Sequence, residues 1–505
     1  DFMDHSFTQM YRGLYAFLSH GDTEMKELFL GLKKPQFDET IKLVSEPDPG
    51  LRVIVEQAVR NSDYYLLEGP PGTGKTSRAM KAMIKEFSDS GKIILLLAYT
   101  NRAVDEICQV LDDQGGLGLS YIRLGSSLSS SENSQPRLLE NVIAHCKRRD
   151  EVREVIDNHK IFVGTVASLS GKSDLFLLKS FDVAILDEAS QVLEPQLLGL
   201  ISSKNASGER SIRKWIMIGD QKQLPAIVIQ PKSMTKVFYD KLYAIGLFDC
   251  RSSLFERLLF NVRRNSWQLA LGTLVKQGRM HQMVSKLPNQ LFYRGELEVA
   301  DPTRQLAEYG KYSVTPVKEG ILSVFDQRLA FLDTIKESDF ESVKTSLNEA
   351  KVACKLVLAL YNHSLVAGIE FDPEKTVGII APYRRQIALI RNLLYESGFK
   401  YAREITIDTI ERFQGSQREV IIYSMCINNL SQVNALSEER IRLQGEDIEI
   451  DRKLNVALTR AREYMVIVGN AKLMRYDEIL NELVSHYETN GGFFPFSEVK
   501  RLFLD

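Results

Sequence analysis

Residues 66–76 read Leu66-Leu67-Glu68-Gly69-Pro70-Pro71-Gly72-Thr73-Gly74-Lys75-Thr76, a complete GxxxxGK(S/T) pattern. The apolar run of residues 64–67 before it predicts a buried strand, and apolar residues at three- and four-residue spacing after Thr76 predict a helix. A strand, a glycine-rich loop and a helix in this order form the context that a phosphate-binding loop requires. An ordinary glycine-rich turn is the alternative, and this context disfavours it.

The chemistry of this loop follows from its residue types. Glycines let backbone N–H groups converge on phosphate oxygens, and the helix N-terminus adds a partial positive charge. Lys75 can reach the β- and γ-phosphates of a nucleotide, and the Thr76 hydroxyl can hold Mg²⁺. The residues predicted to bind the nucleotide here are Gly69, Pro70, Gly72, Thr73, Gly74, Lys75 and Thr76.

Composition narrows the class of protein. The chain has 505 residues, of which 44% are hydrophobic and 26% charged, which is typical of a globular protein with a core of normal size. The net charge of −2 counts against a passive coat on nucleic acid but leaves room for a local basic groove. Five cysteines without a C-x-x-C pair argue against a disulfide framework and against zinc or iron–sulfur sites. We expect a cytoplasmic protein, or a nuclear one if eukaryotic, without a membrane span.

Apolar strands alternate with helical patterns in two regions, which predicts an α/β fold with two lobes, each a parallel sheet flanked by helices. The domains expected are a helical lead-in (1–50), a first lobe (51–265) with a short helical insertion at about 112–160, and a second lobe (266–505). The chain begins at Asp1 rather than Met, so the lead-in is expected to be the remnant of an upstream domain. Residues 432–451 are polar and predict an exposed insertion. The strands expected are 64–67, 93–98, 161–164, 183–186, 215–218, 330–332, 377–380, 405–407, 420–424 and 464–468, and the helices of the second lobe 346–362, 383–397 and 453–460.

Two carboxylates, Asp187 and Glu188, follow the apolar strand at 183–186. Parallel sheets bind their ligands at the carboxyl ends of strands. Asp187 is therefore predicted to bind Mg²⁺, and Glu188 to orient and deprotonate an attacking water. The alternative is a pair of acidic residues that starts a helix, which the preceding phosphate-binding loop makes the weaker interpretation.

Further polar residues follow other apolar runs. Gln223, in the loop after the strand at 215–218, has the reach to sense a γ-phosphate, although a turn without function explains that loop equally well. Arg279, Arg460 and Arg462 are candidates for stabilising charge on a transferring phosphoryl group. A single arginine is more often a surface residue, and the residue types alone do not select these three.

Read together and in this order, the motifs resemble those of superfamily 1B helicases. The likeness is to the group that contains the nonsense-mediated-decay RNA helicase, the senataxin-type helicases and the eukaryotic replication helicase–nuclease. It extends over residues 64–470, nearly the whole chain. The matching blocks are GPPGTGKT (69–76), AYTNRAVDEI (98–107), VGTVAS (163–168), DEASQ (187–191), GDQKQLPA (219–226), SLFERL (253–258), QGRMH (277–281), APYRRQ (381–386), ERFQGSQREVII (411–422) and NVALTRAR (455–462).

The resemblance implies two RecA-like lobes with ATP and Mg²⁺ between them and a single nucleic-acid strand across both. By the same resemblance, Lys75 and Thr76 bind phosphate and magnesium, Gln223, Arg279 and Arg460 contact the γ-phosphate, and Arg462 and Gln417 lie near the nucleotide. The residues implied to contact the strand are Thr100, Asn101, Thr165, Pro225, Tyr383 and Arg384.

Three departures from the family pattern concern the base and ribose. Gly278 stands where the family usually has a tyrosine that packs on the adenine, and Gln417 stands where a carboxylate near the ribose is usual. Only Gln57 is a candidate for the glutamine that reads adenine. These departures leave the phosphate chemistry intact and imply that other nucleoside triphosphates are accepted.

The function expected from the resemblance is an ATP-dependent helicase or translocase acting on single strands, with 5′-to-3′ polarity. DNA is slightly favoured over RNA, because residues Ser62-Asp63-Tyr64 resemble the approach to this loop in the replication helicase–nuclease. A nuclease or adaptor domain upstream is a further expectation. The alternative is a regulatory ATPase switch, gated by nucleic acid or a partner, that never unwinds a duplex.

Overall fold

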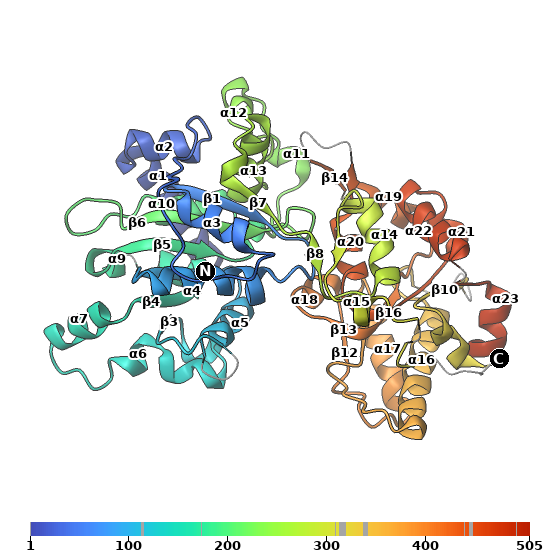
Figure 1. Ribbon diagram of the computed structural model, residues 1–505. Coiled ribbons are helices and arrows are strands. Elements are labelled where there is room, and N and C mark those ends of the chain that lie inside the picture. The colour runs from blue at the N-terminus through green and yellow to red at the C-terminus, as the bar shows by residue number, and fades with distance from the viewer. Residues whose placement is uncertain are drawn as a thin grey trace. The chain divides into compact units, whose positions relative to one another are not determined.

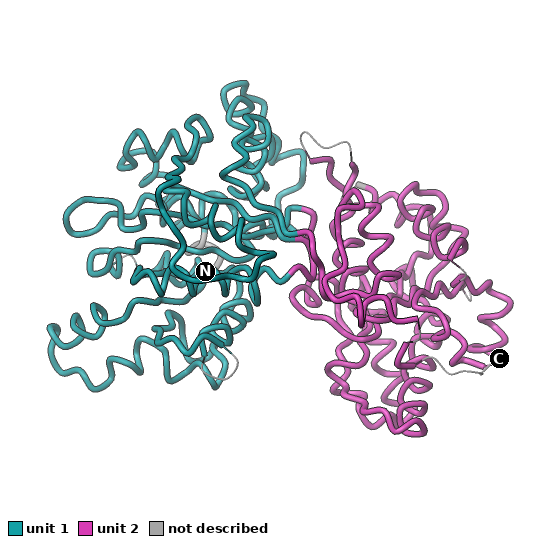
Figure 2. The backbone as a smooth tube through the Cα atoms, viewed as in Figure 1, with its two compact units in different colours: residues 1–69, 74–221, 225–274 teal, residues 70–73, 222–224, 275–505 magenta. Residues whose placement is uncertain are grey.

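The computed structural model describes residues 2–112, 116–172, 174–308, 310–312, 320–336, 342–438, 440–443, 448–490 and 492–505. The chain forms two compact units, coloured separately in Figure 2. The first comprises residues 1–69, 74–221 and 225–274, and the second comprises residues 70–73, 222–224 and 275–505.

The first unit is built on a seven-stranded sheet whose order is β3-β4-β2-β5-β6-β1-β7, with every neighbouring pair parallel (Figure 1). Its strands are β1 (Tyr64–Glu68), β2 (Ile94–Ala98), β3 (Ile122–Leu124), β4 (Ile161–Thr165), β5 (Phe181–Leu186), β6 (Ile212–Gly219) and β7 (Leu271–Thr273). Its α-helices are α1 (Phe2–His20), α2 (Thr23–Phe29), α3 (Arg52–Arg60), α4 (Lys81–Asp89), α5 (Asn101–Leu111), α6 (Leu139–Val142), α7 (Arg149–Asn158), α8 (Val166–Ser170), α9 (Asp174–Leu178), α10 (Glu194–Ile201), α11 (Lys232–Thr235), α12 (Asp240–Ala244) and α13 (Leu254–Arg264).

Helices cover both faces of this sheet because its strands are apolar on both sides. Along β1, Tyr64 and Leu66 pack with residues of α10 and α13, whereas Tyr65 and Leu67 pack with residues of α3, α4 and α5. Side chains alternate between the two faces of a strand, so a continuous apolar run is what a sheet buried on both faces requires. Each fully buried aliphatic side chain contributes about 1.5–3 kcal/mol.

Close contacts pack the N-terminal residues into the first unit. A Cβ on Gly13 of α1 would lie 2.8 Å from the Pro195 carbonyl oxygen and 3.2 Å from the Gly199 nitrogen, so glycine lets α1 cross α10 closely. The fully buried Glu86 carboxylate of α4 accepts backbone hydrogen bonds from Val44 and Ser45, at 2.8 and 2.7 Å. The lead-in is therefore continuous with the core of this unit.

The second unit is built on a six-stranded sheet whose order is β12-β11-β13-β16-β10-β17, again parallel throughout (Figure 1). The strands of this unit are β8 (Lys276–Gln277), β9 (Glu298–Val299), β10 (Leu329–Asp333), β11 (Val377–Ile380), β12 (Thr406–Asp408), β13 (Arg418–Ser424), β14 (Ile441–Arg442), β15 (Glu449–Ile450), β16 (Ala461–Gly469) and β17 (Phe493–Phe494). Its α-helices are α14 (Gln282–Phe292), α15 (Pro302–Gln305), α16 (Leu347–Ala367), α17 (Arg384–Glu396), α18 (Ile410–Phe413), α19 (Leu430–Glu438), α20 (Arg452–Leu458), α21 (Ala471–Met474), α22 (Glu478–Thr489) and α23 (Phe496–Val499).

The same two-sided burial organises this sheet. One face packs with residues of α14, α20 and α22, and the other with residues of α16 and α17. The predicted α/β fold of two parallel sheets with flanking helices is therefore confirmed. The domain boundaries after residues 50 and 265 stay a prediction. The compact units divide differently, because the lead-in packs on α10 and α4 and because β7 pairs with β1.

Two local predictions need correction. The segment 112–160 holds β3 in addition to the short helices expected there, and β3 extends the sheet by pairing with β4. The prediction of an exposed insertion at 432–451 is wrong for its described part, which forms most of α19 and an antiparallel pair of β14 with β15. Arg440 in that segment is buried and donates to the Asp477 carboxylate at 2.5 and 2.7 Å. Residues 439 and 444–447 lie outside the described residues.

Within the described part of the chain, none of the helices combines the length and the apolarity needed to cross a membrane.

Candidate nucleotide and nucleic-acid sites

The phosphate-binding loop leaves β1 at Glu68 and enters a helical turn at Lys75. Gly72 and Gly74 have φ angles of 77° and 79°, in the left-handed region that glycine adopts without strain. The Lys75 Nζ donates a hydrogen bond to the Gly69 carbonyl oxygen at 2.8 Å. A Cβ on Gly69 would lie 2.3 Å from the Lys75 Cγ, so the lysine can fold back along the loop only over a glycine.

The first unit brings Thr76 and Asp187 together, as the motifs predicted. The Thr76 hydroxyl donates to the Asp187 Oδ2 at 2.5 Å, and Asp187 is only 2% exposed. Burial, and next the neighbouring Glu188, raise the pKa of Asp187 to about 6. A buried carboxylate beside a hydroxyl supplies the hard oxygen ligands that Mg²⁺ takes in nucleotide sites, and a cation offsets the cost of burying the charge. The residues present therefore fit a magnesium ion.

Glu188 lies beside both groups in a strained backbone conformation. Its φ is 52°, which is rare for a residue other than glycine and costs about 1–3 kcal/mol when retained. Its Oε1 lies 3.9 Å from the Lys75 Nζ, and its Oε2 accepts a hydrogen bond from the Gln191 side chain at 3.0 Å. The backbone thus presents a carboxylate, steadied by an amide, next to the phosphate-binding lysine.

The second unit brings together the residues predicted to contact the γ-phosphate. Arg460 is 1% exposed and donates to the Gln223 side-chain oxygen at 3.2 Å. The Arg279 guanidinium donates to the Thr459 carbonyl oxygen at 3.3 Å, next to Arg460 in the chain. A Cβ on Gly72 would lie 2.5 Å from the Arg279 Cβ, so the tip of the loop passes directly beside this arginine. Their contact with a γ-phosphate stays a prediction.

The segments of the other residues predicted to lie near the nucleotide are held by backbone and loop hydrogen bonds. Gln417 is exposed and directly precedes Arg418, whose backbone N–H donates to the Arg460 carbonyl oxygen at 3.1 Å. The Arg462 carbonyl oxygen accepts from the His281 N–H at 2.7 Å. In the loop itself, the Thr73 hydroxyl donates to the Pro70 carbonyl oxygen at 2.8 Å. These contacts hold the backbone of the predicted segments together within the second unit.

In the first unit, three of the predicted strand-contacting residues lie at the carboxyl ends of neighbouring strands. Ala98 of β2 pairs with Thr165 of β4, and exposed Thr100 and Asn101 follow β2 two and three residues later. The side chains of Thr100 and Thr165 cap the helices that follow, by accepting backbone hydrogen bonds at 3.2 and 3.0 Å. Pro225 follows β6, which β5 separates from β2. The capping bonds are a structural role that both threonines have in addition to any contact with a strand.

In the second unit, Tyr383 and Arg384 follow β11 and begin α17. The Tyr383 hydroxyl accepts a hydrogen bond from the Gln432 side chain at 2.9 Å, and the Lys344 Nζ lies 6.0 Å from the centre of its ring. Arg384 is exposed. Sequence reasoning missed Lys344 and Gln432, because both come from segments outside the matched blocks. Contact of these residues with a strand stays a prediction.

Family models of known proteins match segments of both compact units. A family model described as an AAA domain matches residues 50–148 and 143–231, and a second model with the same description matches residues 250–472. The mouse (Mus musculus) DNA replication ATP-dependent helicase/nuclease DNA2 is 28% identical over an alignment 495 residues long, which covers 92% of this chain and 42% of that protein. The DNA polymerase alpha-associated DNA helicase A of Schizosaccharomyces pombe is 26% identical over an alignment 487 residues long, which covers 86% of this chain and 65% of that protein.

The chain thus spans less than half of the length of the DNA2 relatives that it matches. Among solved structures, the PRRSV helicase matches 83% of this chain over 54% of its own chain, at 14% sequence identity and a TM-score of 0.37. The two AAA-domain matches contain the phosphate-binding loop, the Asp187–Glu188 pair and the arginine segments in the family's order. The chain belongs to the superfamily 1B helicases, in the group that contains DNA2, the senataxin-type helicases and the nonsense-mediated-decay RNA helicase.

Proposed function

We propose that this chain is an ATP-dependent helicase or translocase that moves along a single nucleic-acid strand. The observation that carries the proposal is the group at the end of β1 and β5: Lys75, Thr76, Asp187 and Glu188. A phosphate-binding lysine, a hydroxyl–carboxylate pair for Mg²⁺ and a second carboxylate form a complete set for phosphoryl transfer to water.

Each residue has a separate task in this proposal. Lys75 binds the β- and γ-phosphates, and Thr76 and Asp187 hold Mg²⁺, which supplies charge neutralisation of the phosphate oxygens. Glu188 accepts a proton from the attacking water, and Gln191 orients the Glu188 carboxylate by its hydrogen bond. Arg279, Arg460 and Gln223 stabilise the charge that develops on the γ-phosphate. Loss of that phosphate removes their contacts, and a difference in strand affinity between the two states makes the cycle directional.

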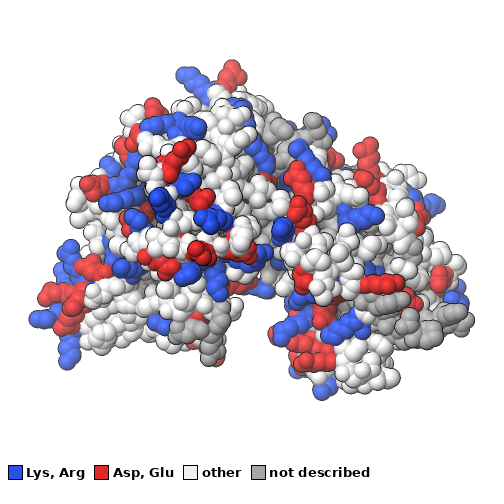
Figure 3. All heavy atoms as spheres, in the orientation of Figure 1, with Lys and Arg blue, Asp and Glu red and all other residues white. Residues whose placement is uncertain are grey.

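The proposal also covers the nucleic-acid substrate and the partner domains. We propose a single strand as the ligand of Thr100, Asn101, Thr165, Pro225, Tyr383 and Arg384, with DNA favoured over RNA and movement from 5′ to 3′. The relatives named DNA2 carry the words DNA replication and helicase/nuclease in their names, which supports DNA as substrate and a nuclease domain or adaptor as partner. On the face drawn in Figure 3, Lys and Arg are interspersed with Asp and Glu, in keeping with the net charge of −2.

The decisive experiment measures ATP turnover with and without a long single strand of DNA or RNA, at low and moderate salt. We expect stimulation by a strand, with an apparent affinity that falls modestly as salt rises, because phosphate contacts release counterions and this chain offers few excess cations. Lys75→Ala is the control and should remove turnover under every condition. If neither strand changes the rate at any salt, the motor proposal is wrong and a partner-gated switch is the better account.

Duplexes with a 5′ or a 3′ single-stranded tail separate unwinding from clamping. We expect strand separation on the 5′-tailed duplex alone. Stimulated turnover without separation of either duplex would favour the regulatory switch over the helicase.

A further inference from the structure

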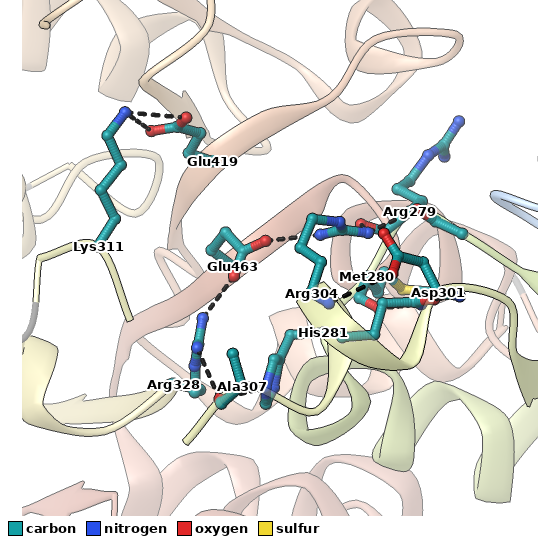
Figure 4. Close-up of polar contacts among 12 residues, drawn as sticks. Arg279, Met280, His281, Asp301, Arg304, Ala307, Lys311, Arg328, Glu419 and Glu463 are labelled. Atoms are coloured by element: carbon teal, nitrogen blue, oxygen red, sulfur yellow. Dashed lines mark hydrogen bonds and ion pairs between the residues drawn. The ribbon is translucent and has the colours of Figure 1, made fainter. Parts of the chain in front are cut away.

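The short helix α15 of the second unit fixes the turn that carries Arg279 (Figure 4). Arg304 of this helix donates two hydrogen bonds from its Nη2, to the Gly278 carbonyl oxygen at 2.6 Å and to the Arg279 carbonyl oxygen at 3.0 Å. Its Nη1 donates to the Glu463 Oε1 at 2.6 Å. One guanidinium therefore ties the backbone of the turn to strand β16.

Glu463 is anchored on its other side as well. Its Oε2 accepts a hydrogen bond from Arg328, which is 8% exposed, and Arg328 also donates to the Ala307 carbonyl oxygen at 3.0 Å. Figure 4 shows the Glu463 carboxylate lying between the two guanidiniums. Glu463 is also the residue directly after the block that holds Arg460 and Arg462. The carboxylate thus joins the two arginine-bearing segments of the second unit through Arg304.

Two buried glutamines hold the remaining backbone groups of the turn. The Gln277 side-chain oxygen accepts from the Arg279 N–H at 3.1 Å, so both the N–H and the carbonyl of Arg279 are bonded. Gln305, which is 0% exposed, donates to the Gln277 and Met280 carbonyl oxygens at 2.9 and 2.6 Å. The Arg279 side chain points away from the Glu463–Arg328 pair (Figure 4). The network therefore holds the arginine by its backbone and leaves its guanidinium outside.

We propose that Arg304 and Glu463 are positioning residues that set the placement of the Arg279 guanidinium for phosphoryl transfer. The proposal rests on the proposed ATPase function and on the role of Arg279 in it. The fixed backbone limits the error in placement, and errors of about 1 Å cost up to 100-fold in rate at such sites. Arg304 suits this task because its planar guanidinium donates to two carbonyls and a carboxylate at once. A lysine ammonium on a flexible side chain would hold these three acceptors less well.

The test is a double-mutant cycle on turnover in the presence of a saturating single strand. Arg304→Ala should lower kcat about tenfold with KM for ATP within about twofold of wild type, because the lost interaction acts in the transition state. Arg279→Ala should lower kcat by at least as much. In the Arg279→Ala background, adding Arg304→Ala should change kcat less than about twofold, because Arg304 acts only through Arg279.

Conservative variants separate positioning from folding. Arg304→Lys keeps the charge and Glu463→Gln keeps the shape, so each should fold and lower kcat partially while KM stays within about twofold. If Arg304→Ala does not fold, these two variants decide the question by the same criterion. Arg475→Ala is the matched control, since Arg475 forms an exposed pair with Glu488 at 2.5 Å in the same unit and should leave kcat unchanged.

The outcomes are distinguishable. A full tenfold loss from Arg304→Ala in the Arg279→Ala background, or wild-type kcat in Arg304→Ala and Arg304→Lys, would overturn the positioning role. Wild-type kcat in Arg279→Ala would instead show that the proposed function has misassigned that arginine. Absence of turnover in the wild-type chain with either strand would reject the proposed function itself.

Discussion

The two compact units have the same strand order but different chemistry at the carboxyl ends of their strands. Without β3, the first sheet reads β4-β2-β5-β6-β1-β7 and the second reads β12-β11-β13-β16-β10-β17. Numbered along the chain within each of these two six-strand sets, both follow the order third, second, fourth, fifth, first, sixth. The likeness extends to register, because Glu68 at the end of β1 pairs with Gly219 and Asp333 at the end of β10 pairs with Gly469.

Even a strained residue is repeated between the units. Two residues after the fourth strand of its sheet, the first unit has Glu188 with φ 52° and the second has Cys426 with φ 49°. In the first unit this residue stands beside Lys75, whereas in the second its N–H donates to the buried Glu349 carboxylate at 2.9 Å. The two units share this backbone conformation but differ in the side chain that it presents, a carboxylate in the first unit and a thiol in the second.

The largest effect should come from removing the carboxylate at one of these two equivalent positions. Glu188→Gln keeps shape and hydrogen bonding but loses the basic group, so turnover should fall about 100-fold or more. Cys426→Ala is the counterpart in the second unit. It should change turnover per folded molecule by less than about twofold, the variation expected of a substitution without effect. Steady-state assays with saturating strand measure both. Equal losses in the two variants would show that the units do not differ in the way proposed.

A second comparison concerns the fifth strands, where Lys214 and Tyr464 each lie five residues before the paired glycine. Burial lowers the pKa of Lys214 to about 7, and its Nζ donates to the Val59 carbonyl oxygen at 2.8 Å. Above this pKa the folded chain lacks a proton that the unfolded lysine keeps, so stability should rise as pH rises from about 7 toward the ordinary lysine value near 10. Lys214→Met should remove that rise.

Thermal unfolding between pH 7 and 9 checks this expectation. The midpoint of the wild type should climb relative to that of Lys214→Met, and both proteins should be compared in the same buffers. A Lys214→Met curve parallel to that of the wild type would mean that the Lys214 ammonium stays charged in the folded chain, over the Phe87 ring that lies 5.3 Å away.

The smallest effect should be on stability at the strained position itself. Glu188→Gly relieves the left-handed backbone and should stabilise the first unit by up to about 1 kcal/mol, while turnover is lost. Cys426→Gly relieves the same strain but deletes a fully buried side chain, so it should destabilise the second unit. Denaturant unfolding measures the two changes. Destabilisation by Glu188→Gly would show that its side-chain contacts outweigh the strain.

Much of the fold was predictable because parallel strands buried on both faces read as continuous apolar runs. The run at 377–380 coincides with β11, and those at 183–186 and 464–468 lie inside the longer strands β5 and β16. Strands β3, β7 and β17 were missed, since each has at most three residues and depends on a neighbour for its pairing. The prediction for segment 432–451 fails because its buried residues depend on distant partners that no local pattern shows: Val433 and Ile450 pack into the core of the second unit, and Arg440 pairs with Asp477.

The candidate site, like the fold, has a part that the sequence predicts and a part that it does not. The association of Thr76 with Asp187 follows from two motifs that a parallel sheet must bring to one edge, and the structure has it. Arg304, Gln305 and Glu463 carried no signal, because an arginine or glutamine that holds a backbone turn is recognisable only from its partners. Gln191, in contrast, lies within the DEASQ block at 187–191. Its side-chain hydrogen bond to Glu188 explains why a glutamine stands at the end of this block.

The parallel order of the first sheet also has a consequence for synthesis on the ribosome. Strand β1 pairs with β6 and β7, so Tyr64 finds no partner strand until Trp215 has been made. At about 5–20 residues per second, the nascent chain carries this apolar segment unpaired for roughly 8–30 seconds. Fragments that end before β6 should therefore aggregate or recruit chaperones, whereas those that continue past β7 complete the sheet around its first strand.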